Sequence, residues 1–260
     1  NKSFTFIDLF AGIGGTRIAF ESAGGKCVFT SEWDAYAAKT YEANFGEKPA
    51  GDITKISTED IPDFDVLLAG FPCQPFSSIG KRQGFEHVTQ GTLFYDVARI
   101  IAVKQPKAFM LENVQGLTTH DKGRTFEVIN ETLADMGYVV KYKILDASDY
   151  GVPQTRKRIY IVGYLPEKCS TKVKSFDFPP PLKNKVGIGK FIESGVEGYS
   201  ISEHLQKSYL YKLNDGRPRI IDKNTRTPAK TLVASYHKIQ RLTGTFVMDD
   251  KTGLRLLSQN

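Results

Sequence analysis

Short apolar runs alternate with helix-like periodic patterns through the first 165 residues of the chain. Runs rich in Val, Ile, Leu and Phe predict strands at 4–10, 26–33, 65–71, 107–114, 139–147 and 157–165. Longer amphipathic patterns predict helices at 14–23, 34–45, 92–104 and 123–136. Such alternation is typical of a doubly wound, mostly parallel α/β sheet, and the close spacing of the last two strands favours an antiparallel edge.

The pattern changes near residue 180. After the segment DFPPPLKNKVGIG come short segments in which Gly, Lys, Tyr and other polar residues dominate. Clusters of such residues indicate turns and irregular structure. We therefore expect two domains, a regular one at 1–178 and a smaller, irregular one at 179–260.

The composition of the chain bears on its partners and on the cellular compartment in which it works. The 260 residues carry 35 Lys and Arg against 29 Asp and Glu, a formal charge of +6, which permits a polyanionic partner without requiring one. The chain has three cysteines, Cys27, Cys73 and Cys169, which are far apart and do not have the spacing of metal ligands. Few, widely spaced cysteines are typical of a protein in a reducing compartment. No run approaches the length of a membrane span and no signal-peptide pattern is present, so we expect a soluble cytoplasmic protein without a membrane partner or a bound metal.

A glycine-rich turn follows the first predicted strand, in the segment FIDLFAGIGG at 6–15. Gly12, Gly14 and Gly15 allow a ligand to approach the backbone at the carboxyl end of that strand, where ligands bind in open α/β sheets. The dinucleotide fingerprint needs a further glycine where this chain has Arg17, so chemistry with a nicotinamide cofactor loses support. A tight turn without a ligand stays open as an alternative.

Glu32, Trp33 and Asp52, which follow the glycine-rich turn in sequence, extend the candidate site. Glu32 ends the second predicted strand, where an acid commonly binds ribose hydroxyls, and Trp33 beside it could cover an adenine face, although a lone Trp more often packs than stacks. Asp52, in the next loop, could bind an adenine amino group. Together these residues favour a nucleoside cofactor without a required pyrophosphate, which points to S-adenosylmethionine.

Cys73 stands in the segment GFPCQPFS, directly after the predicted strand 65–71. One interpretation is a buried thiol that acts as a small hydrophobic side chain. Pro72 and Pro75 stiffen the segment, however, and a polar, glycine-containing loop follows, which favours a nucleophile presented at a strand end. Only the thiolate attacks, so a nearby cation is needed, and Lys81 and Arg82 lie in that loop.

Two further motifs place charged side chains near strand ends. MLENV at 110–114 ends a strand with Glu112, which faces the same sheet edge as Cys73 and could share a proton there, or could cap the following helical segment. In QTRKR, Gln154, Arg156 and Arg158 occupy alternate positions. Period two places them on one face, where they could anchor a phosphate or a carbonyl oxygen or merely keep an edge strand soluble.

These motifs occur together in one known family. The segments FIDLFAGIGG, GFPCQPFS, GTLFYDVARI, MLENV and QTRKR follow the order and approximate spacing of the DNA cytosine-5 methyltransferases, and the chain resembles the bacterial restriction-modification members. The likeness covers residues 4 to about 165, with weaker echoes in TPAKTLVASY at 227–236 and LRLLS at 254–258. It implies the S-adenosylmethionine-dependent methyltransferase fold, with a catalytic and cofactor-binding domain at 1–178 and a target-recognition domain at 179–260.

The resemblance implies covalent methylation of C5 of a cytosine flipped out of double-stranded DNA, with S-adenosylhomocysteine as the product. The Cys73 thiolate would add to C6 and Glu112 would protonate or hydrogen-bond N3, so that C5 can take the methyl group before elimination frees the cysteine. Arg158 would bind the cytosine O2, while Arg156 and Gln154 would support the pocket. Such enzymes protect DNA in restriction-modification systems.

The family pattern also implies which residues bind the cofactor and the DNA. The cofactor-binding residues are Phe6, Leu9, Gly12, Gly14, Gly15, Glu32, Trp33, Asp52, Ile53, Pro72 and Leu93. The family's recognition segments carry a Thr-Leu pair, matched here by Thr231 and Leu232, so the segment that follows should lie near the DNA. We expect DNA contacts from Gln74, Ser77, Lys81, Arg82, Gln154, Thr231, Tyr236, His237, Lys238, Gln240 and Arg241. Lys, Arg, Tyr and Gln suit contacts to phosphates and base edges.

Family members continue beyond the segment that ends this chain at Asn260, into motifs that complete the cofactor pocket. We therefore expect a truncated chain or a second polypeptide that supplies the remainder. Two other functions stay open, an RNA (tRNA) cytosine-5 methyltransferase and a non-catalytic DNA-binding subunit, although Cys73, Glu112 and Arg158 are all present. The sequence does not identify the bases that are recognised.

Overall fold

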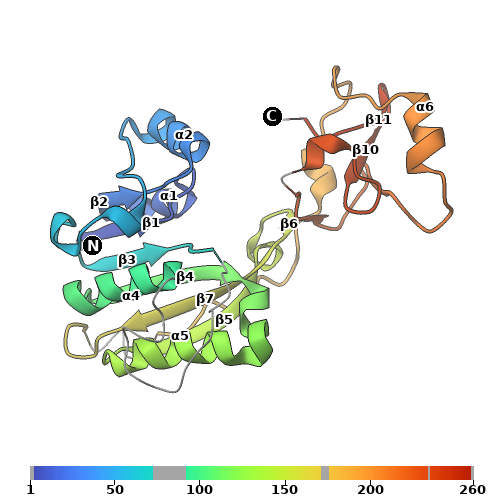
Figure 1. Cartoon of the computed structure of the whole chain (residues 1–260). Coiled ribbons are helices and arrows are strands. Elements are labelled where there is room, and N and C mark those ends of the chain that lie inside the picture. The colour runs from blue at the N-terminus through green and yellow to red at the C-terminus, as the bar shows by residue number, and fades with distance from the viewer. Residues whose placement is uncertain (1–2, 73–91, 171–175, 234, 259–260) are drawn as a thin grey trace. The chain divides into compact units, whose positions relative to one another are not determined.

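The protein divides into two compact units, which are described separately. The computed structural model describes residues 3–72, 92–170, 176–233 and 235–258. One unit comprises residues 1–144 and 158–178, and the other comprises residues 145–157 and 179–260 (Figure 1). The segment 145–157, which the sequence placed with the first domain, belongs to the second unit.

The first unit is built on a single sheet with helices. Its strands are β1 (Phe4–Leu9), β2 (Gly25–Ser31), β3 (Val66–Ala69), β4 (Ala108–Val114), β5 (Val139–Asp146) and β7 (Lys157–Tyr164). Its helices are α1 (Gly15–Ser22), α2 (Ala35–Phe45), α4 (Leu93–Lys104) and α5 (Arg124–Asp135), with the 3₁₀ turns η1 (Ile53–Lys55), η2 (Thr58–Asp60), η3 (Gln115–Thr118) and η4 (His120–Gly123). The strands and helices predicted from the apolar pattern up to residue 165 are all present, so that prediction is confirmed.

The sheet is doubly wound and mostly parallel, as predicted. Its strand order is β2-β1-β3-β4-β7-β5; β1 runs parallel to β2 and β3, β3 runs parallel to β4, and β7 runs antiparallel to β4. The reversal of direction thus occurs at the β4–β7 pair, with β7 inserted between β4 and the edge strand β5. Leu9, Ala69 and Leu111 lie in register across β1, β3 and β4, so the carboxyl ends of these strands meet at one edge.

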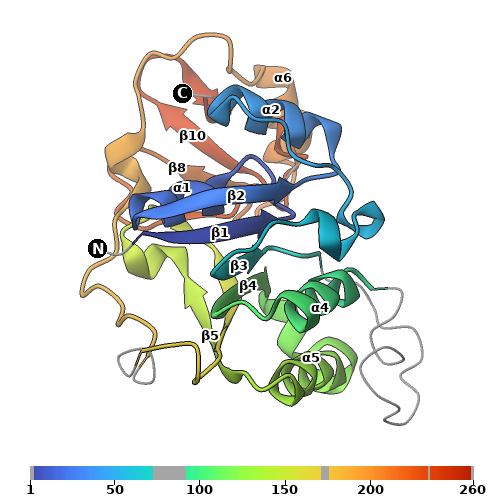
Figure 2. The ribbon, with the colours of Figure 1, turned by 90° about the vertical axis from the view of Figure 1, so that its left-hand side faces the viewer.

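Alternation along β1 gives the sheet two different faces. Ile7 and Leu9 point into the main core, where they meet Val97 of α4 and its apolar neighbours. The helices α4 and α5 lie side by side on this face (Figures 1 and 2). Phe6 points the other way, and its ring centroid lies 5.8 Å from that of Phe20 in α1. Both faces are therefore closed by helices.

Arg17 joins α1 to α2. Its buried guanidinium donates to the Tyr41 hydroxyl at 2.7 Å and to the Glu47 carboxylate at 3.0 Å, and lies 4.4 Å from the centroid of the Phe45 ring. Gly14, which caps α1 with φ +92°, lies against the same ring: a Cβ there would sit 2.1 Å from Phe45 Cε2. The residue that replaces the fingerprint glycine thus packs the two helices together.

The second unit consists of short elements. Its strands are β6 (Gln154–Thr155), β8 (Arg219–Ile221), β9 (Ala229–Lys230), β10 (Thr245–Asp249) and β11 (Gly253–Arg255). Its helical segments are η5 (Ala147–Tyr150), η7 (Ile188–Phe191), α6 (Glu203–Leu205), η8 (Gln206–Leu210) and η9 (Tyr236–Lys238). The strands form a three-stranded sheet in the order β11-β10-β8 and a two-stranded sheet of β6 and β9. A small core of Ile201, Leu210, Phe246 and Leu254 supports the larger sheet.

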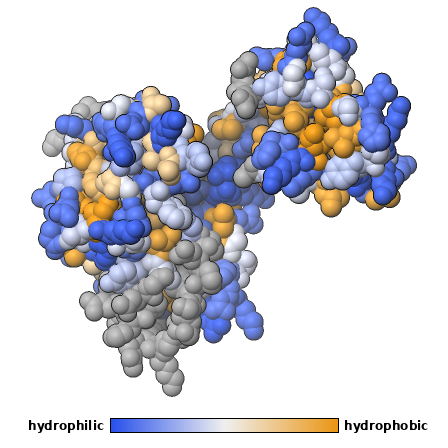
Figure 3. Space-filling model, turned by 45° about the horizontal axis from the view of Figure 1, so that its top comes forward, coloured by the Kyte–Doolittle hydropathy of each residue, from blue (hydrophilic) through white to orange (hydrophobic). Residues whose placement is uncertain are grey.

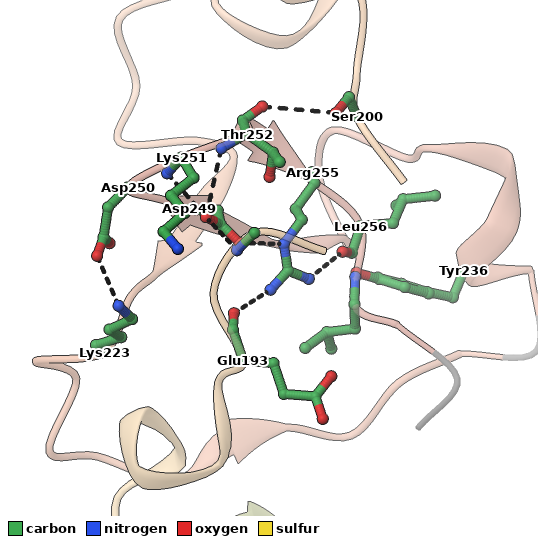
Figure 4. A network of polar contacts seen from close by, with 12 residues as sticks. Glu193, Ser200, Lys223, Tyr236, Asp249, Asp250, Lys251, Thr252, Arg255 and Leu256 are labelled. Carbon is green, nitrogen blue, oxygen red and sulfur yellow. Dashed lines mark hydrogen bonds and ion pairs between the residues drawn. The ribbon is translucent and has the colours of Figure 1, made fainter. Parts of the chain in front are cut away.

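A buried ion pair ties segments of the second unit together. Arg255, which is 1% exposed, donates through Nε to Asp249 at 2.9 Å and through its terminal nitrogens to the carbonyls of Glu193 and Leu256 at 2.7 and 3.0 Å (Figure 4). The Asp249 carboxylate also accepts the backbone N–H of Gly195 at 3.0 Å. The pair therefore links β10 and β11 to the segment 193–195.

The surface drawn in Figure 3 is mostly hydrophilic, with apolar side chains gathered in patches on each unit. The exposed large hydrophobic side chains include Trp33 and Tyr36 in the first unit and Leu213 and Leu242 in the second. Within the ranges that the structure describes, no helix is long and apolar enough to cross a membrane.

Candidate functional site

A cavity of about 230 Å³ opens at the carboxyl ends of β1 and β2. We call it the strand-end cavity, and it is lined by Phe10, Ser31, Glu32, Trp33, Gly51, Asp52, Ile53, Thr54 and Leu93. Of the predicted cofactor-binding residues, Glu32, Trp33, Asp52, Ile53 and Leu93 are thus brought together. Phe10, Ser31, Gly51 and Thr54 are lining residues that the sequence did not identify.

Glu32 is held by the backbone on both sides of its carboxylate. Its Oε2 accepts the N–H of Gly12 at 2.7 Å, and its Oε1 accepts the N–H of Asp34 at 2.8 Å. The side chain comes from the end of β2 and is only 8% exposed. Each carboxylate oxygen has a second lone pair, so this fixed acid can accept hydrogen bonds from hydroxyl groups of a ligand.

Asp52, which also lines the cavity, caps the turn η1. Its Oδ1 accepts both the N–H and the hydroxyl of Thr54, at 3.1 and 2.8 Å. The Thr54 hydroxyl is the largest cause that holds the pKa of the Asp52 carboxyl below its usual range, against burial, which raises it. Asp52 is therefore an ionised, oriented acceptor beside the apolar side chain of Ile53.

Phe6 and Leu9 do not line the cavity, and their predicted cofactor contacts are corrected. Both side chains are fully buried, Phe6 against α1 and Leu9 in the core under α4. Because β1 ends at Leu9, the first side chain free to face the cavity is that of Phe10, which has φ +56°. The sequence has two phenylalanines four positions apart, Phe6 and Phe10, and only the end of β1 decides which of them faces the cavity. The apolar pattern does not mark that end.

The remaining predicted cofactor residues are three glycines of the turn and Pro72, and their surroundings differ. Gly12 has φ +57°, and open space surrounds the position of a Cβ there, so this glycine serves the turn that presents its N–H to Glu32. Gly15 also faces open space, whereas Gly14 is required by its packing on α2. Pro72 is exposed and is not among the lining residues.

Glu112 and Arg158 form an ion pair on the face of the sheet opposite α4. The Arg158 Nε lies 2.9 Å from Glu112 Oε1, with the two side chains 20% and 30% exposed. Their register explains the contact, because Val114 opposes Arg158 across the antiparallel β4–β7 pair, which places Glu112 and Arg158 diagonally on one face. The two side chains therefore lie together at the end of β4.

The end of β4 is also tied to the segment that leads to Cys73. The buried Asn113 amide donates to the carbonyl of Phe71 at 2.8 Å. A Cβ added to Gly70 would lie 3.6 Å from the Glu112 carboxylate, which therefore stands beside the backbone three residues before Cys73. Cys73 itself, together with the predicted DNA contacts Gln74, Ser77, Lys81 and Arg82, lies outside the described residues.

Gln154 and Arg156 are not on one strand face with Arg158, and that prediction is corrected. The chain is in β6 at 154–155 and enters β7 only at 157. At the break, the N–H of Arg156 donates to Asp146 at 3.1 Å and its carbonyl accepts the N–H of Ala147. Gln154 and Arg156 belong to the second unit, whereas Arg158 belongs to the first.

The predicted DNA contacts of the second unit differ in exposure. Thr231 and Lys238 are exposed and Gln240 is half-buried, as are parts of the Tyr236 side chain. The Tyr236 hydroxyl donates to the carbonyl of Thr245 at 2.6 Å and accepts the N–H of Leu257 at 2.9 Å. Its polar atom is therefore engaged within the unit.

Arg241 is buried, which argues against the predicted DNA contact. It is 7% exposed and donates to the carbonyls of Leu210 and Leu213 at 2.9 and 3.1 Å, and its guanidinium also pairs with Asp215. Burying a guanidinium without partners is costly, and here backbone carbonyls thirty residues away supply the partners. Arg241 therefore fixes the loop that follows η8.

The comparison with protein families decides the relationship. The family described as C-5 cytosine-specific DNA methylase matches residues 4–259. The chain belongs to the C-5 cytosine-specific DNA methylase family. Curated members similar to it include the Type II methyltransferase M.MspI of Moraxella sp, 58% identical over 260 residues, and the Type II methyltransferase M.BsuFI of Bacillus subtilis, 59% identical over 256 residues.

The length of these relatives sets the scope of the comparison. The alignments cover 100% and 98% of this chain but 61% and 62% of M.MspI and M.BsuFI, respectively. This chain thus spans somewhat less than two thirds of these DNA methylase family members.

Solved structures agree on the fold of this family member. A DNMT2 variant of Spodoptera frugiperda superimposes with a TM-score of 0.76 at 18% identity, covering 98% of this chain and 85% of its own. The Dnmt2 methyltransferase of S. pombe gives a TM-score of 0.73 at 17% identity, covering 99% and 84%. The predicted methyltransferase fold is therefore confirmed.

Proposed function

We propose that the protein transfers the methyl group of S-adenosylmethionine to C5 of a cytosine in a specific double-stranded DNA sequence, as the modification enzyme of a bacterial restriction-modification system. The observation that carries the proposal is the position of two sites at one sheet edge. The strand-end cavity adjoins β1 and β2, and the Glu112–Arg158 pair stands at the end of β4, whose carboxyl end is in register with that of β1 through β3. A methyl donor and an acceptor base held there would share one edge of the sheet, which is the arrangement that transfer between two bound reactants requires.

The strand-end cavity suits the nucleoside part of the cofactor. Phe10, Ile53 and Leu93 provide apolar walls for a flat base, Glu32 can accept the ribose hydroxyls and Asp52 an adenine amino group. Ser31 adds a buried hydroxyl that has no hydrogen-bond partner among the described residues, as expected where a polar ligand completes the site. Bound S-adenosylmethionine supplies an electrophilic methyl group.

Glu112 and Arg158 would hold the target cytosine. A partly exposed ion pair is worth about 1 kcal/mol or less, so a base that bonds to both partners can replace it at little cost. Arg158 would donate to the base O2 and Glu112 would share a proton with N3, which draws electron density away from C6. Cys73 would then add its sulfur to C6 and the electron pair would move to C5, which would bond to the donated methyl carbon while S-adenosylhomocysteine leaves. Removal of the C5 proton by a base would then return its electron pair to the ring and break the C6–S bond, which frees the methylated base and the Cys73 thiolate.

The second unit would bind the DNA. We propose residues 179–260 as the target-recognition part, joined by 145–157, with Lys238, Thr231 and Gln240 as contacts to phosphates and base edges. Flipping the base costs a few kcal/mol, which contacts from both units would offset. The affinity for DNA should therefore fall steeply as the salt concentration rises.

The test is covalent trapping of the full-length protein on DNA that contains 5-fluorocytosine. With S-adenosylmethionine present, C5 carries fluorine and the new methyl group but no proton for a base to remove, so elimination is blocked and the adduct with Cys73 persists and shifts in a denaturing gel. Cys73→Ser should abolish the adduct, and Glu112→Gln should lower its rate of formation at least tenfold.

Two other cysteines provide matched controls. Burial, the largest cause, raises the pKa of both Cys27 and Cys169, so these groups stay thiols, and Cys27→Ser and Cys169→Ser should trap normally. An adduct that persists in Cys73→Ser would remove the assigned nucleophile. An adduct formed only with RNA would favour an RNA methyltransferase, and none with either would favour a non-catalytic subunit.

A further inference from the structure

Arg99, in the second turn of α4, holds the turn η1, whose first residues line the strand-end cavity. Its Nη2 donates to the carbonyls of Ile53 and Ile56, at 2.7 and 2.9 Å. Its Nη1 donates to the hydroxyl of Thr58 at 3.0 Å. The contacts span 41 to 46 positions along the chain, so they are tertiary and not part of the helix.

The guanidinium is itself fixed in place. Asp96, one turn earlier in α4, accepts from the Arg99 Nε at 2.9 Å, and the Arg99 side chain is only 18% exposed. A planar guanidinium whose Nε is anchored directs its remaining N–H groups in known directions. Arg99 therefore links α4 rigidly to the two turns η1 and η2, and we call this set of hydrogen bonds the Arg99 bracket.

The turn η1 needs such a bracket. It contains three residues and closes with a backbone bond from Ile56 to Ile53 of 3.2 Å, the upper end of the usual range. The hydrogen-bond geometry of 3₁₀ segments is poorer than that of α-helices, so tertiary contacts such as those of Arg99 add to their stability. Yet Asp52, Ile53 and Thr54, which begin this turn, form one side of the cavity lining.

Helix α4 thus meets the cavity in two ways. Leu93, its first residue, lines the cavity directly, and Arg99, six positions later, fixes the turn that carries Asp52 and Ile53. We propose that Arg99 is a positioning residue for cofactor binding, which holds the wall formed by Asp52, Ile53 and Thr54 in the geometry that accepts the nucleoside end of S-adenosylmethionine. This inference rests on the proposed function.

Two substitutions at Arg99 and one elsewhere in α4 test the inference by calorimetric titration of the full-length protein with S-adenosylhomocysteine. Arg99→Met keeps the length of the side chain but removes its donors, and should raise the dissociation constant about tenfold, or about 1.4 kcal/mol. Arg99→Lys keeps one charged donor and should recover part of that loss. Lys104→Met is the matched control, because Lys104 pairs with Asp63 at 3.4 Å at the far end of the same helix and should leave the dissociation constant within about twofold.

Hydrogen exchange on the protein without ligand tests the bracket independently of the cofactor. Arg99→Met should speed exchange of the Thr54 to Ile56 amides, while the Gly12 and Asp34 amides that bind Glu32 stay protected. A double-mutant cycle with Asp52→Asn should show that the two losses of affinity are not additive, because Arg99 acts through the turn that presents Asp52.

The outcomes separate the two proposals. If the unaltered protein binds no S-adenosylhomocysteine, the proposed function fails and the inference falls with it. If it binds, but Arg99→Met and Arg99→Lys keep its affinity, or Lys104→Met loses as much, the positioning role is wrong while the proposed function stands. Additive losses with Asp52→Asn would also overturn the role, because they would show that Arg99 acts on the cavity by another route.

Discussion

Replacing the glycines of the turn between β1 and α1 one at a time should give three different changes in stability. Gly14→Ala is the severe member of the series. A Cβ at Gly14 would lie 2.1 Å from Cε2 and 2.6 Å from Cζ of Phe45, and 3.2 Å from Cδ2 of Tyr41. The Phe45 ring has little room to withdraw, because the Arg17 guanidinium covers it at 4.4 Å.

The size of each change in stability depends on two effects, the backbone strain of alanine at positive φ and the steric overlap of its Cβ. Gly12 and Gly14 both have positive φ, +57° and +92°, and alanine in the left-handed region costs roughly 1–2 kcal/mol at either position. Overpacking adds about 1–3 kcal/mol at Gly14 alone, because nothing lies within 4 Å of a Cβ at Gly12. Gly15 begins α1 in open space without a positive φ, so Gly15→Ala should be neutral or stabilise by up to about 1 kcal/mol.

Urea denaturation of the three variants, followed by far-ultraviolet circular dichroism, measures these differences. The expected order of the free energy of unfolding is Gly15→Ala, then Gly12→Ala, then Gly14→Ala as the least stable. If Gly14→Ala and Gly12→Ala agreed within about 0.5 kcal/mol, the ring contact would carry no energy and the packing argument would be refuted.

Two further predictions concern buried carboxylates. Burial, opposed by the Arg17 N–H, raises the pKa of Asp8 to about 7, so the folded protein keeps a proton there that the unfolded chain loses near pH 4. The unaltered protein should thus lose stability as the pH rises from about 4 to about 7, by up to about 1.4 kcal/mol per pH unit, whereas Asp8→Asn should not; parallel curves of unfolding free energy against pH would contradict this. In the second unit, the backbone N–H groups of Lys251 and Gly195 and the side chain of Arg255 hold the pKa of Asp249 well below its usual range. The contribution of the ionised carboxylate to the free energy of unfolding is therefore present at neutral pH and is lost progressively as the pH falls below about 4. Asp249→Asn should therefore lower the unfolding midpoint more at pH 7 than at pH 3, with the effect shrinking further below pH 3, and an equal shift at pH 7, at pH 3 and below it would show that the charge is not what matters.

The elements of the first unit were predictable because burial there follows the local pattern. Ile7, Leu9 and Phe6 alternate between two covered faces, and such alternation is visible in the sequence. Glu32 was placed correctly for the same reason, since an acid directly after a buried strand reaches the sheet edge. Phe10 was missed because the choice between it and Phe6 depends on where β1 stops, which the apolar pattern does not mark.

The errors near the second unit come from partners distant in sequence. The strand break at Arg156 depends on Asp146 and Ala147, which take its backbone groups in place of a neighbouring strand. Arg241 is buried because the carbonyls of Leu210 and Leu213 need donors, and no local pattern reveals that need. A basic residue between polar neighbours therefore says little about whether it faces solvent.

The discontinuous second unit bears on how target recognition could be exchanged between relatives. Its C-terminal part depends on the earlier segment 145–157: β6 pairs with β9, the N–H of Leu182 donates to the carbonyl of Asp149 at 2.8 Å, and Lys185 pairs with Asp149 at 2.8 Å. A chimera that replaces only 179–260 would set a foreign β9 against the resident β6 and discard these contacts. Under the proposed function, transplanting specificity requires two grafts, one of them the thirteen residues 145–157 that run from the end of β5 to the first residue of β7, and natural recombination would have to carry both pieces together.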